Sequence, residues 1–134
     1  MLRNKSTYKL FALVTVIIIC IVAGIFLSTG DSILSIQNNT DVTISGLKIK
    51  YSNSINDTKV PEILPKQIYK AKLILPEDFT AGSIKVLYTD KLGQNHEEFL
   101  SGYIEKGYKE KISVTISSVE NNGVLSIKLN ENGI

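Results

Sequence analysis

The pattern of apolar residues divides the chain into two parts. An unbroken apolar run without a charge extends from Leu10 to Leu27, whereas apolar residues after Asp31 come in short alternating stretches. The eighteen residues of this run would form a helix of roughly 27 Å, close to the hydrocarbon thickness of a bilayer. The sequence therefore predicts a transmembrane helix over residues 10–27 and a domain of different character after it.

The run has two interpretations, a retained signal-anchor and a cleaved secretory signal. Secretory signals have apolar stretches of about 7–15 residues and small residues at the cleavage site. Ser28 and Gly30 supply small residues for cleavage after Gly30, but the run is longer than usual and no Ala-x-Ala pattern follows it. We favour the anchor. The residues expected to contact lipid include Leu10, Phe11, Ile17, Ile18, Ile19, Phe26 and Leu27.

Charges on the two sides of the run predict its orientation. Arg3, Lys5 and Lys9 precede it, and Asp31 is the first charge after it. Because basic flanks stay in the cytoplasm, we expect a single-pass protein of the cell membrane with its C-terminal domain outside. The expected organisation is a basic cytoplasmic segment over 1–9, the helix over 10–27, a linker over 28–31 and an extracytoplasmic domain over 32–134.

The outer domain shows the period of two that is typical of half-buried strands. Residues 69–75 and 112–117 alternate most clearly, and the alternation changes phase at Gly46, where we expect a β-bulge. Asn122-Gly123 between alternating runs predicts a tight type I′ hairpin turn. About seven short strands without a helical period predict an all-β domain, an antiparallel two-sheet β-sandwich.

The order of these segments permits a comparison with a known class of domain. A strand ending in Asn38-Asn39-Thr40 is followed by a strand over 44–51, then by Pro61-Glu62-Ile63-Leu64-Pro65 and a strand over 69–75 that closes in Pro76. Over residues 32–119 this order resembles the immunoglobulin-like modules of bacterial envelope proteins. The resemblance implies an immunoglobulin-like sandwich and a role in adhesion or interaction. Antibody-type domains add a Cys pair and a buried Trp, which this sequence lacks.

Composition and charge exclude some classes of partner and modification. Three basic residues precede the apolar run, so residues 31–134 carry twelve Lys against thirteen Asp and Glu. This near-neutral balance argues against a nucleic-acid partner. Cys20 is the only cysteine, so an intramolecular disulfide is excluded, and the small residue that precedes a lipoprotein cysteine is missing. Lys outnumbers Arg fourteen to one and Ile and Asn are abundant, which suggests a low-GC Gram-positive source.

Residue patterns that carry catalysis or bind metals are sparse. His96 is the only histidine, and on a strand it shares a face with Glu98 but not with Glu97, whereas a zinc site needs three or four ligands. The polar residues over 53–57 and 90–95 are interpreted as turns rather than calcium sites. Phosphate-binding and nucleophile motifs are absent from the sequence. We expect a protein that is not an enzyme and has no metal or cofactor.

The strongest candidate for a binding surface is the segment 102–111, which repeats a Gly-Tyr-x-Glu-Lys pattern. Tyrosine offers a large contact area and is enriched at interfaces. The simpler interpretation, which we favour, is a turn with one tyrosine packed inward and charged flanks. The candidate partner contacts are Tyr103, Tyr108, Lys106 and Lys109, with Tyr108 the leading exposed aromatic residue. The polar loop over 53–65 is a second candidate, because loops at the end of a sandwich carry recognition.

Together these features predict a membrane-anchored extracytoplasmic binding module that acts by contact with the lipid bilayer and a protein partner. Such a module fits a bacterial immunity-type or envelope-complex protein. The alternatives are an accessory subunit of a secretion or conjugation machinery and, more remotely, a small envelope enzyme.

Overall fold

The computed structural model describes residues 32–130, so the predicted transmembrane helix over 10–27 and its flanking segments lie outside the described range. Within this range no helix is long and apolar enough to cross a membrane. The regular elements from Ser32 to Asn130 are β-strands, and the all-β prediction is confirmed for this part of the chain. The eight strands are β1 (Ile33–Asn38), β2 (Lys48–Tyr51), β3 (Thr58–Lys59), β4 (Ile68–Lys72), β5 (Ala81–Thr89), β6 (Asn95–Glu105), β7 (Lys111–Val119) and β8 (Leu125–Leu129).

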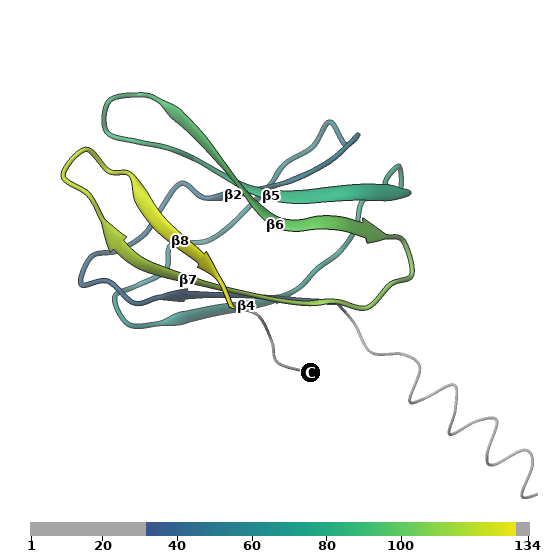
Figure 1. The fold of residues 1–134 in the computed structure, drawn as a ribbon, viewed down its shortest axis with the longest axis horizontal. Coiled ribbons are helices and arrows are strands. Elements are labelled where there is room, and N and C mark those ends of the chain that lie inside the picture. Colours follow the sequence, from purple (N-terminus) through teal and green to yellow (C-terminus); the bar gives the residue numbers. More distant parts are fainter. Residues whose placement is uncertain (1–31, 131–134) are drawn as a thin grey trace, which may run out of the picture. The chain divides into compact units, whose positions relative to one another are not determined.

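The strands form two four-stranded sheets. One sheet has the order β4-β1-β7-β8 and the other has the order β3-β2-β5-β6 (Figure 1). Their apolar residues form one core cluster, to which both sheets contribute. In β7, for example, Ile112, Val114 and Ile116 are buried, whereas Ser113 and Thr115 between them are partly exposed. The two-sheet arrangement therefore follows from the period of two that the sequence displays.

The core is built from strand residues and from residues in the connections. Its buried members are Leu34, Ile36, Ile44, Leu47, Ile49, Tyr51, Val60, Ile63, Leu73, Phe79, Ile84, Val86, Tyr88, Leu100, Ile104, Ile112, Val114 and Ile116. Phe79 comes from the turn-rich link between β4 and β5, and it packs edge-on against Tyr51 with 6.0 Å between the ring centroids. Connections thus supply core side chains as well as turns.

One strand pair differs from the antiparallel sandwich that the sequence predicts, because β1 and β7 are parallel. The chain leaves β6 beside the start of β1, crosses to the other sheet within residues 106–110 and begins β7 opposite Ile33. Both β1 and β7 therefore begin at the same end of the sheet, and β7 runs in the same direction as β1. The crossing between sheets replaces the long connection that parallel neighbours in one sheet normally require.

Two expected turn features also take another form. Gly46 has a φ of 76°, but it lies between the isolated bridge Ile44–Ile63 and β2, so the change of phase occurs outside a strand and is not a β-bulge. In the β7–β8 hairpin only Gly123 has a positive φ, whereas a type I′ turn would also need one at Asn122. Gly123 N donates to Glu120 O and Glu120 N donates to Val124 O, both at 2.8 Å, which defines a three-residue loop.

The two ends of the sandwich are distinct, and we name them by position. The Ser32 end comprises Ser32 itself and the connections 52–57, 73–80 and 106–110. The far end comprises the connections 39–47, 60–67, 90–94 and 120–124. Figure 1 shows the β5–β6 and β7–β8 loops together at one end and the β6–β7 connection at the opposite end.

Candidate functional site

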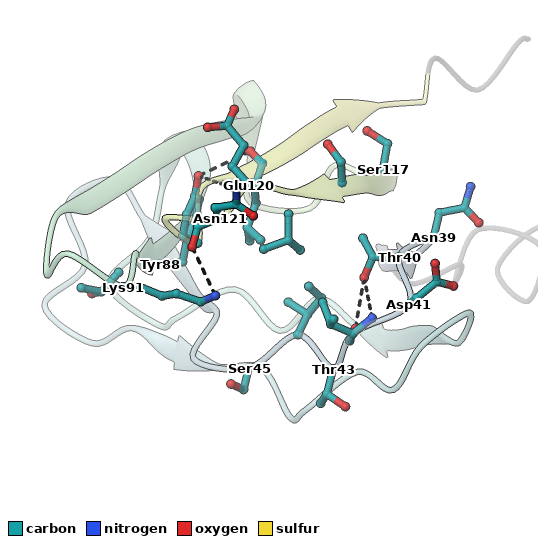
Figure 2. A pocket seen from close by; sticks show the side chains of 17 residues that line it. Asn39, Thr40, Asp41, Thr43, Ser45, Tyr88, Lys91, Ser117, Glu120 and Asn121 are labelled. Carbon is teal, nitrogen blue, oxygen red and sulfur yellow. Dashed lines mark hydrogen bonds between the residues drawn. The ribbon is translucent and has the colours of Figure 1, made fainter.

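A groove of about 670 Å³ opens at the far end. One wall is the β1–β2 connection from Asn39 to Ser45, and the other consists of the end of β7 and its loop to β8 (Figure 2). Tyr88 and Lys91 lie where the β5–β6 hairpin meets these walls. The lining is rich in hydroxyl and amide side chains and carries charges of both signs. Its polar members are Asn39, Thr40, Asp41, Thr43, Ser45, Tyr88, Thr89, Lys91, Ser117, Ser118, Glu120 and Asn121.

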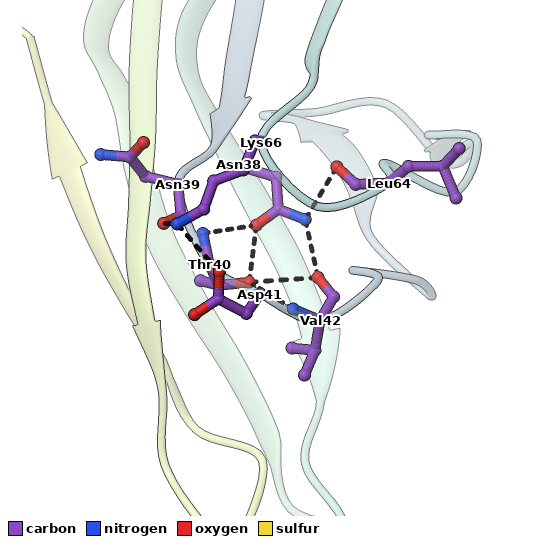
Figure 3. A network of polar contacts seen from close by, with 7 residues as sticks. All are labelled: Asn38, Asn39, Thr40, Asp41, Val42, Leu64 and Lys66. Carbon is purple, nitrogen blue, oxygen red and sulfur yellow. Dashed lines mark hydrogen bonds and ion pairs between the residues drawn. The ribbon is translucent and has the colours of Figure 1, made fainter.

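A buried asparagine holds the first wall in place (Figure 3). Asn38 is 0% exposed, and its Nδ2 donates to the carbonyls of Val42, Ile63 and Leu64 at 2.8, 2.9 and 3.1 Å. Its Oδ1 accepts from Thr40 N at 3.0 Å and from Thr40 Oγ1 at 2.7 Å. Thr40 N depends on this side chain for its acceptor, whereas the carbonyls of Ile63 and Leu64 also accept from Ile44 N and Gln67 N. Asn38 thus joins the two connections through one buried side chain.

An exposed ion pair extends this network at the surface. Lys66 Nζ donates to Asn39 O at 2.9 Å and lies 3.1 Å from the Asp41 carboxylate. Both side chains are largely exposed, so the pair contributes little to stability. It does restrict the position of Asp41, which places a carboxylate at the rim of the groove.

The second wall is joined to the opposite sheet by hydrogen bonds. Lys91 N donates to Asn122 O at 2.8 Å, so the β5–β6 loop packs against the β7–β8 loop. Leu125 N donates to Tyr88 Oη at 3.1 Å, which is a second link between the sheets. Lys91 Nζ lies 3.3 Å from Asn121 O, and its ammonium group is therefore held at the groove (Figure 2).

The only histidine of the sequence supports this same end. His96 Nε2 lies 2.9 Å from Asp90 Oδ2, and the His96 ring stacks on Tyr88 with 4.8 Å between centroids. Asp90 also accepts from the amides of Leu92 and Gln94 at 2.8 and 2.9 Å. The hydrogen bond from His96, followed by that from the Gln94 amide, lowers the pKa of Asp90 below its ordinary value. The ionised Asp90 carboxylate therefore holds the β5–β6 loop through these hydrogen bonds.

The residues that the sequence nominates as partner contacts lie at the opposite end of the sandwich. Tyr103, Tyr108 and Lys109 line a common cleft of about 440 Å³ beside the β6–β7 connection. Both tyrosines are exposed, at 65% and 70% respectively, so neither packs inward. Lys106 is not part of this cleft lining, because its Nζ donates to Glu77 O at 3.0 Å and ties the connection to the β4–β5 link.

The tyrosine cleft is polar at its edge. Tyr103 Oη donates to the Glu105 carboxylate at 2.6 Å, and this hydrogen bond raises the pKa of Tyr103 above its ordinary value. Glu110 accepts from Ser101 Oγ at 3.1 Å, while its backbone N donates to Ser32 Oγ at 3.0 Å. The cleft therefore adjoins the first described residue of the domain.

Residues 53–65, the second predicted binding loop, do not form one continuous surface. Its first part belongs to the Ser32 end, while Val60 and Ile63 in its second part are buried in the core. In the described range no three His, Cys, Asp or Glu side chains are grouped as ligands for a metal ion. The far-end groove was not predicted for two reasons. It is assembled from connections that are remote in sequence, and the polar residues of each connection are those found in any surface turn.

Comparisons with known proteins relate the chain to others through its fold. No protein-family model matches the chain, and no curated protein matches it in sequence. In structure it is similar to a protein from Eubacterium rectale solved by NMR, with a TM-score of 0.50 and 11% sequence identity. The match covers 79% of this chain and 96% of that chain. At this level of identity the similarity extends to the fold alone.

Proposed function

We propose that this protein is a membrane-anchored extracytoplasmic binding module that presents the far-end groove to a protein partner. The observation that carries the proposal is the separation of Ser32 from the groove. The chain reaches the domain at Ser32, and the groove opens at the other end, beyond the last residues of β1, β5 and β7. A domain anchored through the segment before Ser32 would hold the groove away from the membrane.

The anchor itself rests on the sequence. The charge-free run from Leu10 to Leu27 has the length of a bilayer span, and the three basic residues before it favour a cytoplasmic N-terminus. Under this topology residues 32–134 lie outside the cell. An immunity-type protein that holds an incoming toxin and an accessory subunit of an envelope machinery would both use this arrangement.

The chemistry of the groove suits a polar segment of a partner protein. Hydroxyl and amide groups line both walls. The charged residues of the lining are Lys91, Asp41 and Glu120 (Figure 2). Charges of both signs at fixed positions favour specific orientation of a partner over attraction to one kind of charge. A loop or extended strand with polar side chains fits these features.

The topology of the sheets supports the proposal that the domain is immunoglobulin-like. Immunoglobulin sheets contain strands C, F and G as neighbours, with C′ beside C in variable-type domains, and strands E and B as neighbours in the other sheet. The orders β3-β2-β5-β6 and β4-β1 follow the same pattern in the same chain order. The departures are β7, which occupies the place of strand A beside β1 but runs parallel to it, and β8, which extends that edge of the sheet by pairing with β7.

Site-specific photo-cross-linking in cells tests the groove. A benzophenone amino acid at Thr43, in the groove wall, should give a discrete cross-linked protein. The same amino acid at Lys70, on the outer face of β4, serves as the matched control and should give none. Equal labelling from both positions, or none from Thr43, would contradict the assignment of the groove as the partner site.

A further inference from the structure

The Ser32 end carries exposed apolar and aromatic side chains from three separate connections. Tyr108 is 70% exposed in the β6–β7 connection, Ile74 is 73% exposed after β4, and Ile55 is 92% exposed between β2 and β3. Tyr103 lies beside Tyr108 in the same cleft. We infer that this end of the sandwich rests on the outer leaflet of the bilayer, with these side chains in the headgroup layer. The inference rests on the proposed anchor.

The hydrogen bonds of Ser32 connect the start of the domain to these surfaces. Ser32 Oγ donates to Tyr108 O at 3.1 Å, and Ser32 O accepts from Leu73 N at 2.8 Å, directly before Ile74. The place where the chain enters the domain is therefore fixed beside Tyr108 and Ile74. Whatever brings Ser32 close to the membrane brings these two side chains close as well.

Covalent connection limits how far Ser32 can lie from a span that ends at Leu27. Residues 28–31 separate the two, and five extended Cα steps cover at most about 17 Å. The headgroup layer itself occupies roughly 5–8 Å on each side of the hydrocarbon core. Even a fully extended linker thus leaves Ser32 no more than about 9–12 Å beyond the headgroup layer, and a more compact linker brings it to the headgroups. The far end lies farther away by the length of the strands.

The side chains match the interfacial environment. Tyrosine has an apolar ring and a polar hydroxyl, and it is enriched where membranes meet water. Lys109 lies in the same connection and can place its ammonium group near lipid phosphates, whereas Lys106 Nζ donates to Glu77 O. The connections of the same end also carry Asp57, Glu77, Asp78 and Glu110, which outnumber the two lysines, so there is no net electrostatic attraction to anionic lipid. Contact should therefore depend on the aromatic and aliphatic side chains more than on anionic lipid.

The absence of tryptophan from the sequence allows a direct measurement. Full-length Tyr108→Trp protein, reconstituted in phosphatidylcholine vesicles that contain brominated acyl chains, should show strong quenching of its fluorescence. A Leu92→Trp variant at the far end is the matched control and should show several-fold weaker quenching. Ile74→Trp is a second reporter for the Ser32 end, should Tyr108→Trp reduce the thermal stability of the domain. Anionic lipid should change the quenching little.

Two outcomes separate this inference from the proposed function. Vesicle flotation reports the anchor, so protein that does not float contradicts the anchor and bilayer contact together. Protein that floats while Tyr108→Trp and Ile74→Trp are quenched no more than Leu92→Trp contradicts bilayer contact alone. In that second case, photo-cross-linking from Tyr108 to a protein would assign the tyrosine cleft to a protein partner instead.

Discussion

At the scale of single residues, Asn38 links two connections through one buried side chain. It lies at the end of β1, and its amide contacts three carbonyls and accepts from one backbone N–H in these connections. The sequence shows Asn38 only as part of a polar turn, because Asn38, Asn39 and Thr40 look alike without coordinates. Burial distinguishes Asn38 from Asn39, whose side chain is exposed.

Replacement of Asn38 tests this role. Asn38→Ala removes the acceptor of Thr40 N at a buried position, so we expect the free energy of unfolding to fall by about 1–3 kcal/mol. Asn39→Ala, the exposed neighbour, should change it by less than about 0.5 kcal/mol. Urea denaturation measures both. Similar values for the two variants would mean that water or neighbouring groups replace the amide of Asn38.

Asp90 gives the domain a pH-dependent stability of known sign. Its pKa is lower in the folded state than the value of about 3.9 expected for an unfolded chain. The ionised carboxylate therefore stabilises the fold above about pH 4, and this contribution is lost as the pH falls through the folded pKa. Asp90→Asn should be less stable than the parent protein at pH 7, with a difference that shrinks below about pH 4. Asp57→Asn, in an exposed loop, is the control, and a constant Asp90→Asn difference across pH would contradict the role.

At the scale of elements, hydrophobic alternation identifies the strands but not the geometry of their connections. The alternation in residues 69–75 and 112–117 correctly predicts β4 and β7, since one face is buried in β7 and partly buried in β4. The burial of Phe79 and the turn type at Asn122-Gly123 depend on contacts with distant residues, which a local pattern does not contain. For segment 102–111 the sequence favours a turn with one tyrosine packed inward, but both tyrosines are exposed, as the candidate contact Tyr108 was expected to be.

The contact between the far-end loops predicts unequal effects for two similar glycines. Gly93 and Gly123 both have positive φ, but a Cβ on Gly123 would lie 2.9 Å from Lys91 N, whereas one on Gly93 would have nothing within 4 Å. Gly93→Ala should cost about 1–2 kcal/mol for the backbone conformation alone. Gly123→Ala should cost more, because it also separates the two loops. Thermal denaturation compares them, and equal losses would show that the loop contact contributes nothing.

At the scale of the whole molecule, the arrangement depends on one crossing that the sequence does not reveal. Residues 106–110 carry the chain between sheets, which makes β7 parallel to β1 and places the tyrosine cleft beside Ser32. The same topology gathers the ends of β1, β5 and β7 around the far-end groove. The sequence therefore predicts the class of fold and nominates Tyr108 as an exposed aromatic residue. It does not predict which end of the domain each surface occupies, because that depends on the path between sheets.

The two-ended arrangement has a direct test in intact cells. In a Cys20→Ser background, a membrane-impermeant maleimide should label Leu92→Cys at the far end without permeabilisation. The same reagent should label Asn4→Cys, in the basic N-terminal segment, only after the membrane is opened. Both variants should remain in the membrane fraction at full-length mass. Labelling of Asn4→Cys alone in intact cells, or a soluble chain that begins at Asp31, would contradict a domain that is anchored beside Ser32 and displays its groove outside the cell.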